Sequence, residues 1–154
     1  MDSNSLKEWG EKNNVINRTI EGFWEYISNW EKEHPDEFHD LFMGKLDRRL
    51  IKLEIKSIQL THIFNYSDFV YCNISIYLLE DYISIGNYKM VFTLDGEIED
   101  DILDLKDYSF IRNEISLIKN SIKIAQNALK HGAEPEFVSA ITGLNMEYVA
   151  NLIK

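Results

Sequence analysis

The sequence contains few of the residues that build disulfide frameworks, metal clusters or flexible linkers. Its 154 residues include one Cys, two Pro and seven Gly. Because Cys72 is alone, an internal disulfide and a cysteine-rich zinc site are excluded. Cys72 lies in the alternating run FVYCNISIYLL, so we expect a buried structural thiol. No repeat, linker or low-complexity tract is present.

Long hydrophobic runs are also missing. Uncharged stretches such as Phe69 to Leu79 reach 11 residues, whereas a membrane-spanning helix needs about 20. The N-terminal segment MDSNSLKEWGEKNN is charged and has no apolar centre, which is not typical of a signal peptide. We therefore expect no membrane partner and a cytoplasmic location.

Positive charge is scarce. The chain has 16 Lys and Arg against 26 Asp and Glu, which gives a formal net charge of −10. An acidic surface repels a phosphate backbone, so a basic protein is the expected partner and nucleic acid is not. Residues 45–56 nevertheless hold five basic and two acidic side chains, whereas residues 95–107 hold seven acidic side chains and one Lys. Either these segments face each other or water, or the acidic one forms a docking face.

Signatures of catalysis and of cofactor binding are not found. There is no glycine-rich dinucleotide loop, no Walker loop and no nucleophile elbow. The four histidines, at positions 34, 39, 62 and 131, do not have the spacing of metal ligands. The sequence therefore predicts no metal, no cofactor and no enzymatic activity.

Apolar residues make up 45% of the chain, enough for one domain with a sizeable core. They recur at helical spacing between about residues 14 and 33, after a capping-box pattern at Ser5 and Glu8. His34 and Pro35 end this helix, and Pro35 begins a second helix with one apolar face. An N-terminal helical pair is predicted.

From Leu50 onward the apolar period changes to two, which is typical of strands. The alternation shifts at Ser57, and the segments NYSD and LED are expected to form turns. Asp95-Gly96 is the strongest hairpin signal in the chain. We predict an antiparallel meander of about four strands, with one face packed and one exposed to water.

Apolar residues from Ile111 to Leu129 step alternately by four and three, and this long helix is expected to cover the sheet. The same seam could instead pack against a second copy of the chain, so a homodimer is an alternative oligomeric state. After Gly132, short helices are predicted from Pro135 to about Thr142 and from Asn145 to the end. The predicted fold class is α+β, with a core domain over residues 1–131 and a C-terminal helical hairpin over 132–154, packed on the core or appended to it.

The last residues, ALKHGAEPEFVSAITGLNMEYVANLIK, have the shape of a helix-turn-helix. Such a motif has a small residue, a glycine at the turn and an aliphatic residue that packs the two helices together. In this segment these residues are Ser139, Gly143 and Val149. Residues 128–154 carry two Lys against three Glu, so their charge does not favour contacts with DNA phosphates. The hairpin is expected to pack or to dock onto protein, with a small core of Phe137, Ile141, Leu144 and Val149.

The segment IAQNALKHGAEPEFVSAITGLNMEYVANL resembles the tail IA..LL..G.s.e.I...TGLs.eeI..L of bacterial transposase and nuclease proteins of the Rpn type, in the PD-(D/E)XK superfamily. The resemblance covers about a fifth of the chain. It implies a helical tail that is also attached to unlike domains. The matching positions are Ile124, Ala125, Ala128, Leu129, Gly132, Glu136, Phe137, Ile141, Thr142, Gly143, Leu144 and Val149.

A nuclease of that superfamily would hold Mg²⁺ with an acidic residue followed by Glu-x-Lys on a strand. Asp47, Glu54 and Lys56 offer this pattern, with Glu54 and Lys56 on one strand face. Lys52 shares that face, as in any strand with one solvated side. The strand is followed by a meander, whereas the superfamily has a crossover helix at this point. Both observations favour an ordinary solvated strand. A divergent Mg²⁺-dependent nuclease, or a transposase-associated protein, is therefore the alternative function.

The preferred hypothesis is a non-enzymatic acidic module that binds a basic protein. The main body is loosely similar to small bacterial immunity or inhibitor proteins, which neutralise a basic toxin or nuclease. Tyrosines beside acidic residues are typical of protein interfaces. The expected partner-binding residues are Glu97, Glu99, Asp100, Asp101, Asp104, Tyr71 and Tyr77.

Overall fold

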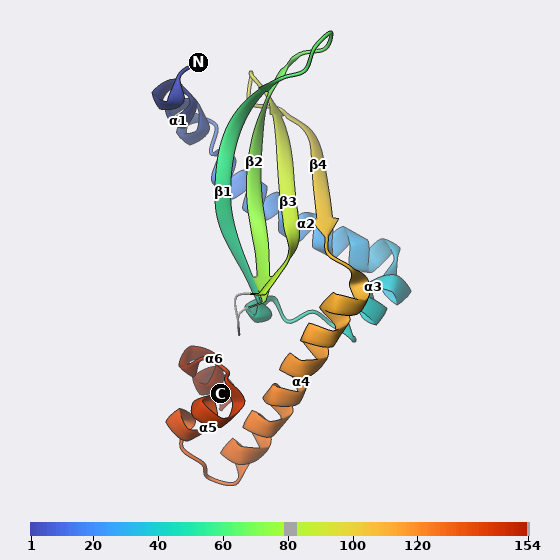
Figure 1. Cartoon of the computed structure of the whole chain (residues 1–154), viewed down its shortest axis with the longest axis vertical. Helices are drawn as coiled ribbons and strands as arrows, with labels where there is room; N and C mark the ends of the chain where they lie inside the picture. Colours follow the sequence, from blue (N-terminus) through green and yellow to red (C-terminus); the bar gives the residue numbers. More distant parts are fainter. Residues whose placement is uncertain (79–82, 154) are drawn as a thin grey trace.

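The computed structural model describes residues 1–78 and 83–153 and has the predicted α+β layout, with helices at both ends of one antiparallel sheet (Figure 1). The elements are α1 (Ser3–Lys12), α2 (Val15–Glu33), α3 (Pro35–Phe42), the 3-10 turn η1 (Arg48–Leu50), β1 (Ile51–His62), β2 (Asp68–Leu78), β3 (Ile83–Thr93), β4 (Ile98–Leu105), α4 (Tyr108–Lys130), α5 (Pro135–Thr142) and α6 (Met146–Asn151).

The sheet is the predicted meander, with strand order β1-β2-β3-β4. The shift expected at Ser57 is a bulge between Ile55 and Ser57. Gly96 has a φ of 87° in the β3–β4 turn, a left-handed conformation that glycine adopts without strain. The turn expected at LED, residues 79–81, lies outside the described residues.

The N-terminal region contains one more helix than the predicted pair, because α1 precedes α2. Its N-cap is Asp2, whose Oδ1 accepts a hydrogen bond from the Ser5 backbone N–H at 2.8 Å. The expected capping box at Ser5 and Glu8 is therefore wrong, since Ser5 already lies inside the helix. Asn14 takes a left-handed conformation between α1 and α2, which allows the second helix to start in a new direction.

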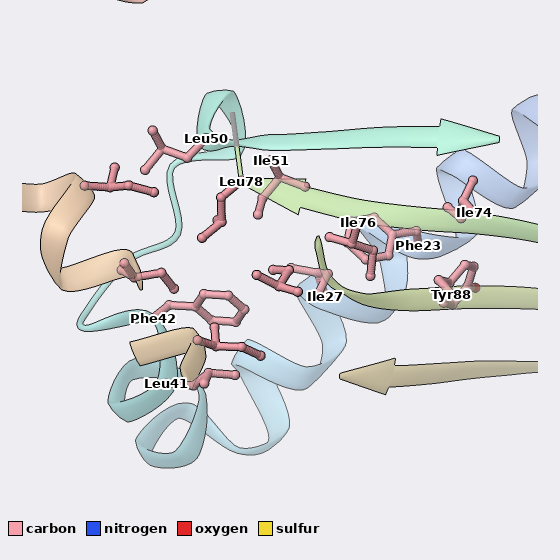
Figure 2. Close-up of a cluster of buried hydrophobic side chains, with 14 of the residues drawn as sticks. Phe23, Ile27, Leu41, Phe42, Leu50, Ile51, Ile74, Ile76, Leu78 and Tyr88 are labelled. Carbon is pink, nitrogen blue, oxygen red and sulfur yellow. The ribbon is translucent and has the colours of Figure 1, made fainter. Parts of the chain in front are cut away.

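One face of the sheet packs against α2, while no described helix lies over the opposite face (Figure 1). Phe23 and Ile27 of α2 contribute to a buried apolar cluster with Ile74, Ile76 and Tyr88 of the two central strands (Figure 2). Burying a large apolar side chain contributes about 1.5–3 kcal/mol. Cys72 is fully buried in the same cluster, as expected.

The long helix α4 leaves the end of β4 and runs away from the sheet (Figure 1). Its seam residues Ile111, Ile115 and Ile118 are buried, but α4 contacts chiefly α3 and α5, whereas α2 contacts the strands β2 and β3. The covering contact expected of α4 is thus made by α2. Most of the seam is thus buried within the chain, whereas Ile122 and Leu129 remain partly exposed.

The C-terminal hairpin has the predicted caps. Asn145 Oδ1 accepts from the Tyr148 N–H at 2.7 Å, and Gly143 ends α5 with a φ of 75°. Its buried side chains, Val138, Leu144, Tyr148 and Val149, belong to the same core cluster as the sheet.

The expected hairpin core is only half correct. Leu144 and Val149 are buried, but Phe137 and Ile141 are 59% and 51% exposed. Helix α5 packs on α4 with the side that carries Val138, which is buried in their place.

We expect Gly86→Ala to lower the free energy of unfolding by about 1–3 kcal/mol. A Cβ at this position would lie 2.3 Å from the Asp104 carbonyl oxygen, and this backbone atom belongs to the neighbouring strand. Urea unfolding measures the change.

Gly132→Ala is the control, because its Cβ meets open space and only the φ of 87° adds strain, about 1 kcal/mol. A Gly86→Ala loss no larger than the Gly132→Ala loss would contradict the close approach of β3 and β4.

Candidate protein-binding groove

A groove runs between α2 and the edge strand β4. α2 packs on β2 and β3, while β4 pairs only with β3, and residues of α2 and β4 together line the groove. The groove consists of two hollows of about 510 and 450 Å³, which share Tyr26, Trp30 and His34. We call it the α2–β4 groove.

The β3–β4 turn is held against the N-terminal helices. The Trp9 indole N–H donates to the Leu94 carbonyl at 2.8 Å, and Arg18 Nη1 donates to the Gly96 carbonyl at 2.7 Å. The Arg18 guanidinium also lies 5.0 Å from the centre of the Phe92 ring. These contacts fix where β4 begins relative to α2, and so fix one end of the groove.

The groove is acidic. Its lining includes carboxylates from α2, α3 and β4, and no Lys or Arg of the described residues lies in the wall of either hollow. A basic side chain entering it would therefore find several acceptors and no competing cation. The carboxylate residues are Glu25, Glu33, Glu37 and Asp101, and Asp104 borders the groove at the edge of β4.

Aromatic rings form much of the remaining surface. Tyr26 lies 6.2 Å from the ring of Tyr88, and Trp30 lies 6.4 Å from the ring of Tyr108 and 5.3 Å from that of Phe38. Packed rings of this kind are rigid, and they attract Arg and Lys through their faces. The groove thus combines negative charge with aromatic contact area.

Two tyrosine hydroxyls bind carboxylates of the groove. Tyr88, fully buried, donates to Asp101 Oδ2 at 2.7 Å, and Tyr108 donates to Glu37 Oε1 at 3.3 Å. Burial raises the pKa of Tyr88 far above its usual range, and the hydrogen bond to Asp101 raises that pKa further. Burial and the Glu37 charge also raise the pKa of Tyr108. Both tyrosines therefore remain protonated donors that orient the carboxylates.

The structure divides the expected partner-binding residues between the two faces of the sheet. Asp101 opposes Met90 and lies in the groove. Asp104 borders the groove at the β4 edge, but it opposes Asn87, so alternation places its side chain on the same face as that of Asp100. Asp100 pairs with Val91 of β3, which in turn pairs with Tyr71 of β2. These three side chains therefore share one face of the sheet, the open face that α2 does not cover.

The other predicted residues lie outside the groove. Glu97 and Glu99 are exposed at the start of β4. Tyr71 and Tyr77 are on the open face, beneath Lys89 at 4.7 Å and Lys56 at 5.3 Å from the ring centres. Because these tyrosines contact cations of the chain itself, they are not part of the acidic groove.

Sequence reasoning missed the residues that α2 contributes. Glu25 and Glu33 are eight positions apart and Tyr26 and Trp30 four, so the helical period places each pair on one flank. The sequence therefore predicts that these residues share one side of the helix, but it does not show that this side faces β4.

The alternative nuclease residues are engaged with other groups. Asp47 caps η1, binds Arg49 at 2.8 Å and accepts from the Tyr148 hydroxyl at 3.3 Å. Glu54 and Lys56 pair with each other at 3.1 Å on β1. In the described part of the chain, no group of three or more His, Cys, Asp or Glu could hold a metal ion.

Among the helices that the structure describes, none has the length and apolar character to cross a membrane.

We expect the unfolding free energy to fall as pH rises above about 10, because unfolded Tyr88 would release a proton that the folded protein retains. The raised folded pKa gives stability that is fully present below the unfolded pKa. Above the unfolded pKa, the free energy of unfolding falls by at most about 1.4 kcal/mol per pH unit. Urea unfolding between about pH 9 and pH 11 measures this slope.

Tyr88→Phe should flatten the slope, whereas Tyr66→Phe, at an exposed position, should retain it. Equal slopes in both variants would show that Tyr88 ionises freely in the folded protein.

Comparison of the chain with protein-family models, with curated proteins and with solved structures finds no match.

Proposed function

We propose that this protein is a non-enzymatic binding module that captures a basic protein segment in the α2–β4 groove. The single observation that carries the proposal is the lining of this groove, which joins the carboxylates of Glu25, Glu33, Glu37 and Asp101 to packed aromatic rings and, among the residues that the structure describes, contains no Lys or Arg.

Charge complementarity supports a basic partner. The chain has a formal net charge of −10, so long-range attraction would bring a basic protein toward it and raise the association rate. Screening by salt shortens this attraction to about 8 Å at physiological ionic strength. Binding is therefore expected to weaken steeply as salt is added.

Aromatic residues support a protein partner over a free cation. Tyr and Trp are enriched where protein interfaces gain most of their binding energy. Tyr26 and Trp30 are half-buried, so each ring is held by packing and still offers a surface. An Arg side chain could stack on such a ring and reach a carboxylate at the same time.

An immunity or inhibitor role would follow from this chemistry. Toxins that cut nucleic acids carry basic surfaces for phosphate, and an acidic module that covers such a surface blocks the substrate. In this proposal the partner is a basic toxin or nuclease, and the groove receives its Lys and Arg side chains.

The test compares two triple variants of equal net charge. Glu25→Gln with Glu33→Gln and Glu37→Gln removes three groove charges, whereas Glu134→Gln with Glu136→Gln and Glu147→Gln removes three charges from the C-terminal region. Immobilised protein captures partners from the native host at low and high salt, and each captured protein is then titrated.

We expect the groove triple to weaken binding by about 100-fold, at ~1 kcal/mol for each charge, and to flatten the salt dependence. The control triple should bind within about threefold of the unchanged protein. Equal losses in both triples would mean that net charge alone attracts the partner. Capture of no basic protein at low salt would overturn the proposed function.

A further inference from the structure

A second concave site has the opposite charge. It lies where α4, α6 and the segment between α3 and β1 meet, and has a volume of about 300 Å³. Among the residues that the structure describes, four cationic side chains line it, Lys45, Arg49, Lys119 and Lys123, with one carboxylate, Asp47. We call it the cationic pocket.

Two of the cations have structural roles. Arg49 holds Asp47 through a guanidinium–carboxylate contact of 2.8 Å, so these two charges compensate each other. Lys119 Nζ donates to the Phe42 carbonyl at 2.9 Å and to the Met43 carbonyl, which satisfies the end of α3.

The other two cations have no such role. Across residues 1–78 and 83–153, neither Lys45 nor Lys123 forms an ion pair with a carboxylate. Burial and the nearby charge of Lys123 lower the pKa of Lys119, as expected where positive charges gather without an anion. An anion placed among them would relieve this repulsion.

The floor of the cationic pocket is apolar. Phe42, Leu50, Leu78 and Ile115 are buried there, and Ile122 and Leu152 are partly exposed in its wall. A simple phosphate would make no use of this surface. A ligand with an apolar body would exclude water from it and gain the hydrophobic contribution.

We infer that the cationic pocket binds an amphipathic carboxylate, with the carboxylate between Lys45 and Lys123 and the aliphatic chain on the floor formed by Leu50, Leu78 and Ile115. The volume of about 300 Å³ is at the lower end of small-ligand sites, which suits a chain of about eight to ten carbons. This site shares no lining residue with the α2–β4 groove, so it stands apart from the proposed function.

The experiment titrates decanoate, below its micelle concentration, into the full chain by isothermal calorimetry. Decanol tests the chain without the charge, acetate tests the charge without the chain, and inorganic phosphate tests a simple anion. We expect saturable one-to-one binding of decanoate, with the three others at least about tenfold weaker. Amide chemical shifts should move at Ile122, Tyr148 and Leu152, which line the cationic pocket.

Charge variants locate the carboxylate. Lys45→Gln with Lys123→Gln should weaken decanoate binding about tenfold, whereas Lys32→Gln with Lys130→Gln, an equal change of charge outside the pocket, should leave it unchanged. A second variant, Gln126→Glu, adds a negative charge to the pocket wall and should also weaken binding, with Gln59→Glu on β1 as its control.

Each contrary result would overturn the inference. Equal losses in the paired variants would indicate bulk charge, and decanol binding as tightly as decanoate would indicate apolar contact alone. Acetate or phosphate binding as tightly as decanoate would indicate a simple anion site. Decanoate that does not saturate below about 1 mM would mean that there is no site.

Discussion

Packing of α2 across the two central strands is the contact on which the other features of the molecule depend. Phe23 and Ile27 meet Ile74, Ile76 and Tyr88, and these side chains form the centre of the apolar cluster. Because α2 packs chiefly on β2 and β3, a groove remains between this helix and β4. Since α2 occupies the central strands of this face, α4 packs on α3 and α5.

The two concave sites show how an acidic chain can keep opposite charges apart. Carboxylates gather where α2 faces β4, and tyrosine hydroxyls orient Asp101 and Glu37 there. Cations gather beside the start of β1 and the end of β2, where Lys119 satisfies the last carbonyls of α3. Although the net charge of the chain is −10, the cationic pocket is locally positive, which composition alone does not show.

The strands and caps were predictable because their signals are local. Alternation of apolar side chains marks each strand, and the bulge at Ser57 coincides with the shift of that alternation. Gly143 and Asn145 act as caps through contacts within five residues. The phase of α5 was harder, since Phe137, Val138 and Ile141 are all apolar and only the position of α4 selects Val138.

The candidate site was only partly predictable, because it joins segments that are distant in the chain. The acidic run in β4 was evident, but alternation directs Asp100 and Asp101 to opposite faces. Their companions Glu25, Tyr26 and Trp30 come from a helix more than 70 positions earlier in the chain.

The sequence by itself determined the class of fold, the antiparallel meander, the caps of the C-terminal hairpin and the negative charge, because periodicity, caps and composition act over short distances. Only the tertiary structure decided which helix covers the sheet, which carboxylates meet aromatic rings and where the cations converge. Those outcomes depend on how helices and strands that are distant in the sequence pack against each other, which local sequence patterns do not specify.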